Sequence, residues 1–175
     1  MKSADTLTIR PFTAEDDATL ISWITSPEML VQWAGTTFSF PLTSLQLEEY
    51  RKEPDSIIWS AEKEGRLIGH LALRKIDHTH NSARIGKVIV GVPEERGRGY
   101  AGQMVSHALS TAFEDLQLHR VSLGVFDFNA AAIHAYRKLG FHYEGTYRDF
   151  RKVGDTYWNL IEMSMLEDEW RERNA

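Results

Sequence analysis

Stretches in which hydrophobic residues alternate with polar ones or run together predict six or seven β-strands. Leu7 and Ile9 alternate with threonine and arginine, and Pro11 ends this first run. A largely hydrophobic run that includes Ile85 and Ile89 predicts a buried strand. The strands are expected at residues 7–9, 57–62, 67–75, 84–92, 121–126, 141–153 and 156–166.

Hydrophobic residues spaced three and four apart predict the helices. The clearest case is residues 103–116, where hydrophobic side chains recur at positions 104, 105, 108, 109, 112, 113 and 116. Thr13 opens another helical pattern, and Asp16 completes a Thr-x-x-Asp capping sequence. The other helices are expected from Ser26-Pro27 through Trp33, from Thr43 or Ser44 toward Arg51, and from Asn129 to Leu139 before Gly140.

The order of these elements predicts an α/β fold with a mixed, mostly antiparallel sheet and helices on both of its faces. The turn Glu64-Gly65-Arg66 joins strands 57–62 and 67–75 into an antiparallel hairpin. The middle of the chain instead runs strand, helix, strand, helix, which is typical of parallel pairing. Because 175 residues contain no linker or internal repeat, a single domain, 1–175, is expected.

The composition limits the classes of function open to the chain. The absence of cysteine excludes a disulfide framework, a thiolate nucleophile and a cysteine zinc site. A net charge of −5 argues against a nucleic-acid surface and suits a cationic partner such as an amine. Residues 1–9 lack the hydrophobic core of a secretory signal, and no run approaches the length of a membrane span. A cytoplasmic protein without membrane contact is therefore expected.

A glycine-rich turn between a buried strand and the strongest helix is the densest chemical signal in the sequence. Gly97, Gly99 and Gly102 alternate there with Arg96 and Arg98. Amides at a helix start lack intrahelical acceptors, the helix dipole favours an anion there, and glycines let phosphate oxygens approach the backbone. The turn therefore predicts a phosphate-binding site.

Two other interpretations of this turn stay open from the residues alone. Gly97, Gly99 and Gly102 also satisfy Gly-x-Gly-x-x-Gly, so an NAD(P)-binding or flavin enzyme is an alternative. That fingerprint expects its first glycine directly after a strand of a parallel sheet and an acidic residue about 20 positions later. Here residues 93–96 intervene and Asp127 comes late. A tight loop with solvated arginines is the second alternative.

Arg96, Gly99 and Ala101 match Arg/Gln-x-x-Gly-x-Gly/Ala, and the chain thereby resembles the GNAT superfamily of N-acetyltransferases. The resemblance implies that backbone amides from Arg96 to Gly102 hold the pyrophosphate of acetyl-CoA. It also implies that strand 84–92 parts from the next strand, so that amides at about Val90 and Val92 pair with the pantetheine arm. The cofactor-binding residues expected on this basis are Val90, Gly91, Val92, Arg96, Gly97, Arg98, Gly99, Tyr100, Ala101, Gly102, Asn129, Ala132 and Tyr136.

A second stretch, residues 129–141, is similar to the family's Asn-x-x-Ala-x-x-x-Tyr-x-x-x-Gly-Phe. Seven residues make nearly two helical turns, so Asn129 and Tyr136 lie on one helix face and can line one ligand. A phenol with a reference pKa of about 10 can protonate a departing thiolate, which makes Tyr136 the candidate catalytic acid. The alternatives are a core aromatic at Tyr136 and a plain helix cap at Asn129.

The two ends of the chain resemble a bacterial branch of the family that modifies ribosomal-protein N-termini and has relatives acting on polyamines or antibiotics. The similar residues are 7–12, Asp16-Asp17, Glu162-Met163, Leu166 and Glu169-Trp170. In such proteins the region of residues 33–43 recognises the acceptor. The acceptor stays open between a protein N-terminus and a small polyamine-like or aminoglycoside-like amine, and the resemblance makes a homodimer plausible.

Acetyl transfer from a thioester to an amine needs an uncharged amine, a pocket for the oxyanion and a proton for the thiolate. Backbone amides near Val90 are expected to serve the oxyanion. Direct transfer without an acetyl-enzyme is expected because cysteine is absent. The general base stays open among Glu28, His70, Asp127, His134 and Glu162.

No metal is expected, and the last alternative to an enzyme is a catalytically silent acyl-CoA-binding module. His78 and His80 resemble a metal pair only in their spacing, and no further ligands stand nearby in the sequence. A silent module would keep the phosphate-binding turn but would not depend on Tyr136.

Overall fold

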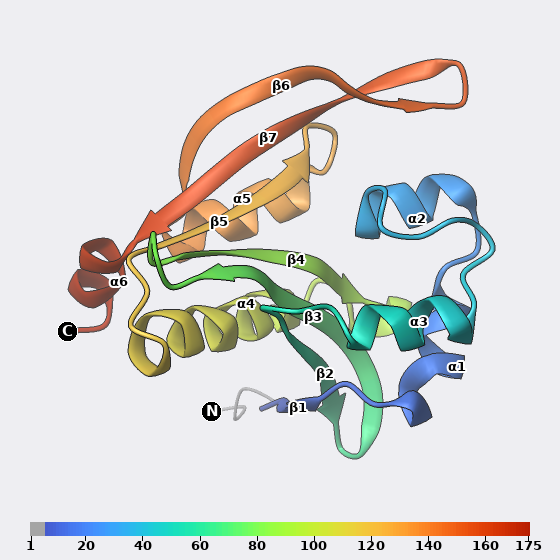
Figure 1. Ribbon diagram of the computed structural model, residues 1–175, viewed down its shortest axis with the longest axis horizontal. Coiled ribbons are helices and arrows are strands. Elements are labelled where there is room, and N and C mark those ends of the chain that lie inside the picture. The colour runs from blue at the N-terminus through green and yellow to red at the C-terminus, as the bar shows by residue number, and fades with distance from the viewer. Residues whose placement is uncertain (1–5) are drawn as a thin grey trace.

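The computed structural model describes residues 6–175 and contains a seven-stranded sheet with helices on both faces (Figure 1). The strand order is β1-β2-β3-β4-β5-β7-β6, and all neighbouring strands are antiparallel except β4 and β5. The predicted mixed, mostly antiparallel α/β fold is confirmed. Residues 1–5 of the segment 1–9, in which no secretory signal is expected, lie outside the described residues. Among residues 6–175, no helix is both long and apolar enough to cross a membrane.

The elements follow the predicted order. The strands are β1 (Thr8–Pro11), β2 (Ile57–Lys63), β3 (Arg66–Asp77), β4 (Ser82–Val90), β5 (Arg120–Phe126), β6 (His142–Val153) and β7 (Thr156–Leu166). The α-helices are α1 (Asp17–Trp23), α2 (Pro27–Ala34), α3 (Ser44–Arg51), α4 (Tyr100–Ser110), α5 (Ala130–Leu139) and α6 (Glu167–Arg173). Short 3₁₀ turns, η1 (Ala14–Asp16) and η2 (Pro93–Glu95), and a π-helical turn, η3 (Thr111–Asp115), complete the chain.

The sheet separates two hydrophobic clusters. On one face, α4 and η3 place Met104 and Phe113 against the strands, and both side chains are fully buried. On the other face, α1, α2 and α3 bury Leu20, Leu30 and Leu47. Each such side chain stabilises the fold by roughly 1.5–3 kcal/mol relative to an exposed one. The hydrophobic face predicted for residues 103–116 is therefore the face that packs on the sheet.

Two predicted boundaries near the turn are wrong, and one C-terminal helix was not predicted. The strand expected over residues 84–92 ends at Val90, because Pro93 begins a 3₁₀ turn. The helix expected from residue 103 begins at Tyr100, with Gly99 in a left-handed conformation as its N-cap. The hydrophobic pattern also gave no indication of α6, which buries Trp170.

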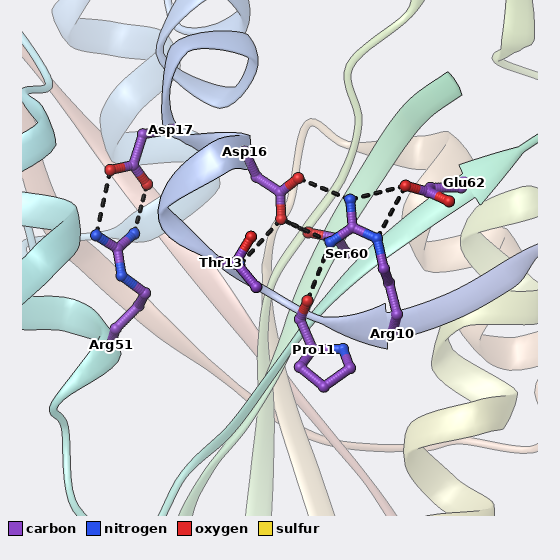
Figure 2. Close-up of polar contacts among 8 residues, drawn as sticks. All are labelled: Arg10, Pro11, Thr13, Asp16, Asp17, Arg51, Ser60 and Glu62. Atoms are coloured by element: carbon purple, nitrogen blue, oxygen red, sulfur yellow. Dashed lines mark hydrogen bonds and ion pairs between the residues drawn. The ribbon is translucent and has the colours of Figure 1, made fainter. Parts of the chain in front are cut away.

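An ion-pair network joins β1 to the first helical turn and to β2 (Figure 2). The Arg10 guanidinium donates to both carboxylate oxygens of Asp16, each at 2.8 Å, and to Glu62 Oε1 at 2.8 Å. Asp16 also accepts from the Thr13 amide at 3.0 Å and from Ser60 Oγ at 2.7 Å. The predicted capping contact of Asp16 is therefore confirmed, and its carboxylate belongs to a wider network.

Candidate active site

The parallel strands β4 and β5 pair over a short stretch and then part. Residues 82–84 face residues 120–122, and no pairing between these strands extends further within residues 6–175. Lys87 has a φ of 54°, and the β3–β4 register places two residues, Lys87 and Val88, opposite Leu71 alone. This is a β-bulge, which bends the strand and increases its twist. The splayed strand pair that the family resemblance implies is therefore present.

The backbone of Val90 faces this gap. Gly91 N donates to Ile68 O at 2.8 Å, so the backbone of Gly91 faces β3. Successive residues of an antiparallel strand direct their N–H and C=O groups to opposite sides, so those of Val90 face away from β3. The Val90 carbonyl accordingly accepts a hydrogen bond from Arg96 Nε at 2.9 Å. The Val90 amide therefore points away from β3, toward the open edge of β4.

Gly97 and Gly99 give the turn before α4 a backbone that other residues adopt only with strain. Their φ angles are 74° and 84°, in the left-handed region. No heavy atom lies within 4 Å of a Cβ built on either residue, so the surface of the turn is open. The first amides of α4 follow directly and have no intrahelical acceptors. The turn thus presents the amides and the positive dipole end that the sequence predicted.

Three of the residues expected to bind the cofactor can offer a ligand only their backbone. The side chains of Val92 and Tyr100 are buried in the cluster under α4. A Cβ on Gly91 would lie 1.8 Å from the Trp23 ring, so no side chain fits there. Arg96 and Arg98 are exposed beside the turn.

Helix α5 presents Asn129 and Tyr136 to one cavity, as their spacing predicted. Asn129 caps the helix, its Oδ1 accepting from the Ala132 amide at 3.2 Å. Tyr136 is 8% exposed and packs edge-on against Phe141, with 5.9 Å between the ring centroids. Burial raises the pKa of Tyr136 to about 12, so the phenol holds its proton at neutral pH. Tyr136 therefore packs in the core and Asn129 caps the helix, and both residues also line the cavity.

The cavity has a volume of about 710 Å³ and lies where β4 and β5 part. The end of α2 and the following loop close one side through residues 31–37, while the β6–β7 hairpin, which extends along the top of Figure 1, closes another. Of the segment 33–43, expected near the acceptor, residues 33–37 line this cavity. The hairpin contributes Tyr147, Phe150, Arg151, Leu160 and Glu162.

Ion pairs engage two arginines of the cavity wall. Arg84 donates to both carboxylate oxygens of Glu162. Arg74 does the same to Glu53, with Nε at 3.1 Å and Nη2 at 2.6 Å. Lys87 differs, because its Nζ is buried without a hydrogen-bond partner among the described residues. Burial, reinforced by the charge of Arg74, lowers the pKa of Lys87 to about 7.

Of the five residues considered as general base, Glu162 alone lines the cavity, and Arg84 holds its carboxylate. His70 is buried beneath α3, where its Nε2 lies 3.0 Å from the Tyr50 hydroxyl. Burial lowers the pKa of His70 to about 3, so its ring is neutral but out of reach of a ligand. The other three candidates are exposed and outside the cavity wall, namely Glu28, Asp127 and His134.

Sequence reasoning did not find the cationic side of the cavity. Arg74, Arg84 and Arg151 come from three strands, and only the register and the path of the hairpin bring them together. Lys87 carried the one available signal, since it interrupts an otherwise hydrophobic strand pattern.

The sequence matches the acetyltransferase (GNAT) family over residues 27–141. The match covers more than half of the chain, and the chain belongs to this family. The strand order, with β4 and β5 as the parallel pair in the described sheet, does not fit the dinucleotide-binding alternative, which needs a largely parallel sheet.

Curated relatives include enzymes named for two kinds of acceptor. The chain is 30% identical over 118 residues to spermidine N(1)-acetyltransferase of Vibrio cholerae, covering 67% of this chain and 66% of that protein. It is 27% identical to spermidine N(1)-acetyltransferase of Escherichia coli K12, covering 97% of this chain and 91% of the relative. It is 30% identical to the putative ribosomal N-acetyltransferase YdaF of Bacillus subtilis, covering 61% of this chain and 57% of the relative.

Solved structures agree with this membership. The spermidine N-acetyltransferase of Vibrio cholerae in complex with CoA and spermine superposes with a TM-score of 0.81 at 27% identity, covering 94% of this chain and 98% of that one. A structure described as a dodecamer of that enzyme gives a TM-score of 0.77 at 25% identity, covering 97% and 98%. The chain is therefore a GNAT N-acetyltransferase that carries the acetyl group of acetyl-CoA to a primary amine.

Proposed function

We propose that the pyrophosphate of acetyl-CoA lies on residues 96–102, its pantetheine arm follows β4, and its thioester occupies the gap between β4 and β5. The orientation of Val90 carries this proposal, since its backbone faces the gap and not β3. The open turn at Gly97 and Gly99 leads into the N-terminus of α4, where the helix dipole favours a phosphate. Arg96 and Arg98 add positive charge beside that turn.

Acetyl-CoA supplies the acetyl group as a thioester, and the attacking amine displaces the thiol without an acetyl-enzyme. The Val90 amide is suited to stabilise the oxyanion, because it projects from the edge of β4 into the gap. Losing such a donor typically costs on the order of 100-fold in rate. Tyr136 is proposed to protonate the departing sulfur, since its phenol stays protonated and lies on the cavity wall.

The amine is proposed to enter from the cavity and to lose its proton to water. Among residues 6–175, Glu162 is the one carboxylate on the wall, and Arg84 donates to both of its oxygens. An α-amine, with a pKa of about 8, needs less help to become neutral than an alkyl amine near 10.4. Both a protein N-terminus and a small amine stay candidates at this level.

Replacing Tyr136 by phenylalanine tests the assignment of the acid. The Tyr136→Phe variant is expected to lower kcat about 100-fold, because the thiolate leaves without a proton donor. The KM for acetyl-CoA should change little, since the ring and its packing remain. Tyr143→Phe is the matched control, as Tyr143 is an exposed β6 hydroxyl outside the cavity wall. Thiol release at saturating amine is the measurement, and unchanged kcat would remove Tyr136 from this role.

We also propose that the chain self-associates through the β6–β7 hairpin. Tyr147 on the edge strand β6 and Tyr157 on β7 expose 52% and 56% of their surface, and exposed aromatic side chains grouped on one hairpin are typical of an interaction surface. A related enzyme is described as a dodecamer. Sedimentation velocity should give a mass above 20.0 kDa that falls in a Tyr157→Lys variant. A monomer at all concentrations would contradict this.

A further inference from the structure

The charges around the cavity favour an anionic acceptor. Five cationic residues line it, against the single carboxylate of Glu162; the cations are Arg74, Lys75, Arg84, Lys87 and Arg151. Arg84 takes up that carboxylate, and Arg74 is paired with Glu53, which lies behind the wall. The remaining cations thus leave the cavity with an excess of positive charge, although the whole chain has a net charge of −5.

Each of two of these side chains has one buried nitrogen without a hydrogen-bond partner among the described residues, while Arg151 Nη1 donates to the Phe150 carbonyl at 3.3 Å. Lys87 Nζ and Arg151 Nε are buried and make no hydrogen bond to any described residue. Lys87 Nζ lies against aromatic rings, 5.1 Å from the Tyr50 centroid, and Arg151 stacks on Phe150 at 4.0 Å. Buried cationic groups usually have an anionic or hydrogen-bonding partner, because burying them alone is costly. A bound anion would supply that partner.

The phosphates of acetyl-CoA, placed as proposed, cannot be this anion. None of residues 96–102, where the pyrophosphate is proposed to lie, lines the cavity, whereas Lys87 and Arg151 both do. The acetyl thioester itself carries no charge. The anion must therefore belong to the acceptor.

A polyamine fits this wall poorly. A second ammonium group would meet Lys87 and Arg151, and no unpaired carboxylate on the wall could receive it. Like charges in a partly desolvated cavity repel each other. The charges of the cavity wall therefore favour an acceptor other than a polyamine.

We propose, building on the proposed function, that the acceptor is an α-amine with a carboxylate a few bonds from its nitrogen, bound by Arg151 with support from Lys87. A free amino acid and a peptide with an acidic residue at its start both carry this chemistry. Arg151 is a specificity residue here, since its guanidinium receives the carboxylate while the amine points toward the gap and Tyr136.

Matched acceptors that differ only in charge test the proposal. Glutamate is compared with glutamine, an amino acid with its amide, and the peptide Ala-Glu with Ala-Gln, with spermidine as the polycation. Thiol release from acetyl-CoA should show kcat/KM at least tenfold higher for the more anionic member of a pair, as for a charge-assisted hydrogen bond. A preference confined to amino acids or to peptides identifies the source of the carboxylate.

The variant Arg151→Gln should remove that preference by raising KM for the anionic member far more than KM for the neutral member. Arg148→Gln is the matched control, because it loses the same charge from an exposed β6 position outside the cavity wall. Equal effects of Arg151→Gln on both members would overturn the assignment.

Three further results would overturn the acceptor proposal while leaving acetyl transfer intact. They are a preference for spermidine, acetyl-CoA binding without turnover of any anionic amine, and faster reaction with succinyl-CoA, which would place the anion on the acyl group. Calorimetry of acetyl-CoA with the wild-type chain tests the proposed function separately. Absence of binding there would overturn the cofactor site itself.

Discussion

Lys87 lies in the bulge of β4, and its Nζ lies among the aromatic rings of the hydrophobic cluster that α1, α2 and α3 cover. The side chain is 4% exposed, and Phe38 and Tyr50 face its Nζ at 5.9 Å and 5.1 Å. Cation–π contact offsets part of the cost of removing an ammonium group from water, but less than a carboxylate would. This residue therefore costs the fold stability in a way that depends on pH.

The pKa of Lys87 gives the sign of that dependence. Burial lowers the folded-state pKa from 10.5 to about 7, below the unfolded value. Between pH 7 and 10.5 the unfolded chain binds a proton that the folded chain lacks, so stability rises with pH. Below pH 7 Lys87 is protonated in both the folded and the unfolded chain, so burial of its charge lowers the stability by the full amount.

Lys87→Met should consequently stabilise the protein, and more so at low pH. Methionine keeps the aliphatic stem against the rings without a charge. The gain over wild type, from urea unfolding without ligand, should shrink from pH 7 to pH 9 by roughly 1.4 kcal/mol per unit at most. The same gain at both pH values would show that Lys87 keeps its proton in the folded chain up to pH 9, so that burial does not lower its pKa.

At the scale of single elements, the junction of η2 and α4 depends on backbone geometry that only glycine adopts without strain. Gly99 caps α4 at a φ of 84°, and Gly65 has a φ of 79° in the turn between β2 and β3. Both positions have open space around a Cβ. An alanine at either site would therefore cause backbone strain without a side-chain clash.

This pair separates cofactor binding from stability. Gly99→Ala and Gly65→Ala should each cost about 1 kcal/mol of unfolding free energy, since alanine resists a positive φ. Gly99→Ala alone should raise the KM for acetyl-CoA, by about tenfold, because the relaxed turn moves the amides that face the pyrophosphate. Thermal melts and initial rates measure the two effects, and equal KM values would argue against phosphate binding at the turn.

The sequence predicted most elements because their hydrophobic periods are strong, and it indicated candidate site residues where these lie within one segment. The turn at residues 96–102 and the Asn129 to Tyr136 spacing are both contained in single segments. The π-helical turn at residues 111–115 keeps the same apolar positions as an α-helix, so the pattern could not separate them. The bulge at Lys87 and the pairing of Arg84 with Glu162 depend on register between distant strands. No local sequence pattern could therefore predict the cationic side of the cavity.

At the scale of the whole molecule, the layer of α1, α2 and α3 is tied to the sheet by buried carboxylates (Figure 2). Arg51 bridges both oxygens of Asp17, which joins α3 to α1. Asp16 is 4% exposed and joins the same layer to β1 and β2 through Arg10 and Ser60. In the same layer, α2 is joined to β4 by Trp33 Nε1, which donates to the Lys87 carbonyl at 2.9 Å beside the cavity.

Asp16→Asn should loosen this layer with a characteristic pH dependence. Burial alone would raise the pKa of Asp16, but hydrogen bonds from Arg10, the Thr13 amide and Ser60 outweigh it and lower the pKa to about 2. The folded pKa is thus below the unfolded value of 3.8, so the stabilisation is present above about pH 4 and lost as pH falls to 2. The variant should lose about 2 kcal/mol at pH 7, less than for a fully buried pair because Arg10 keeps Glu62 and is partly exposed. Urea unfolding at several pH values should show wild type and variant converging below pH 4.

Glu15→Gln, at the exposed neighbouring position, should stay within about 0.5 kcal/mol of wild type. A constant difference across this range would mean that the asparagine variant fails through packing and not through the lost charge.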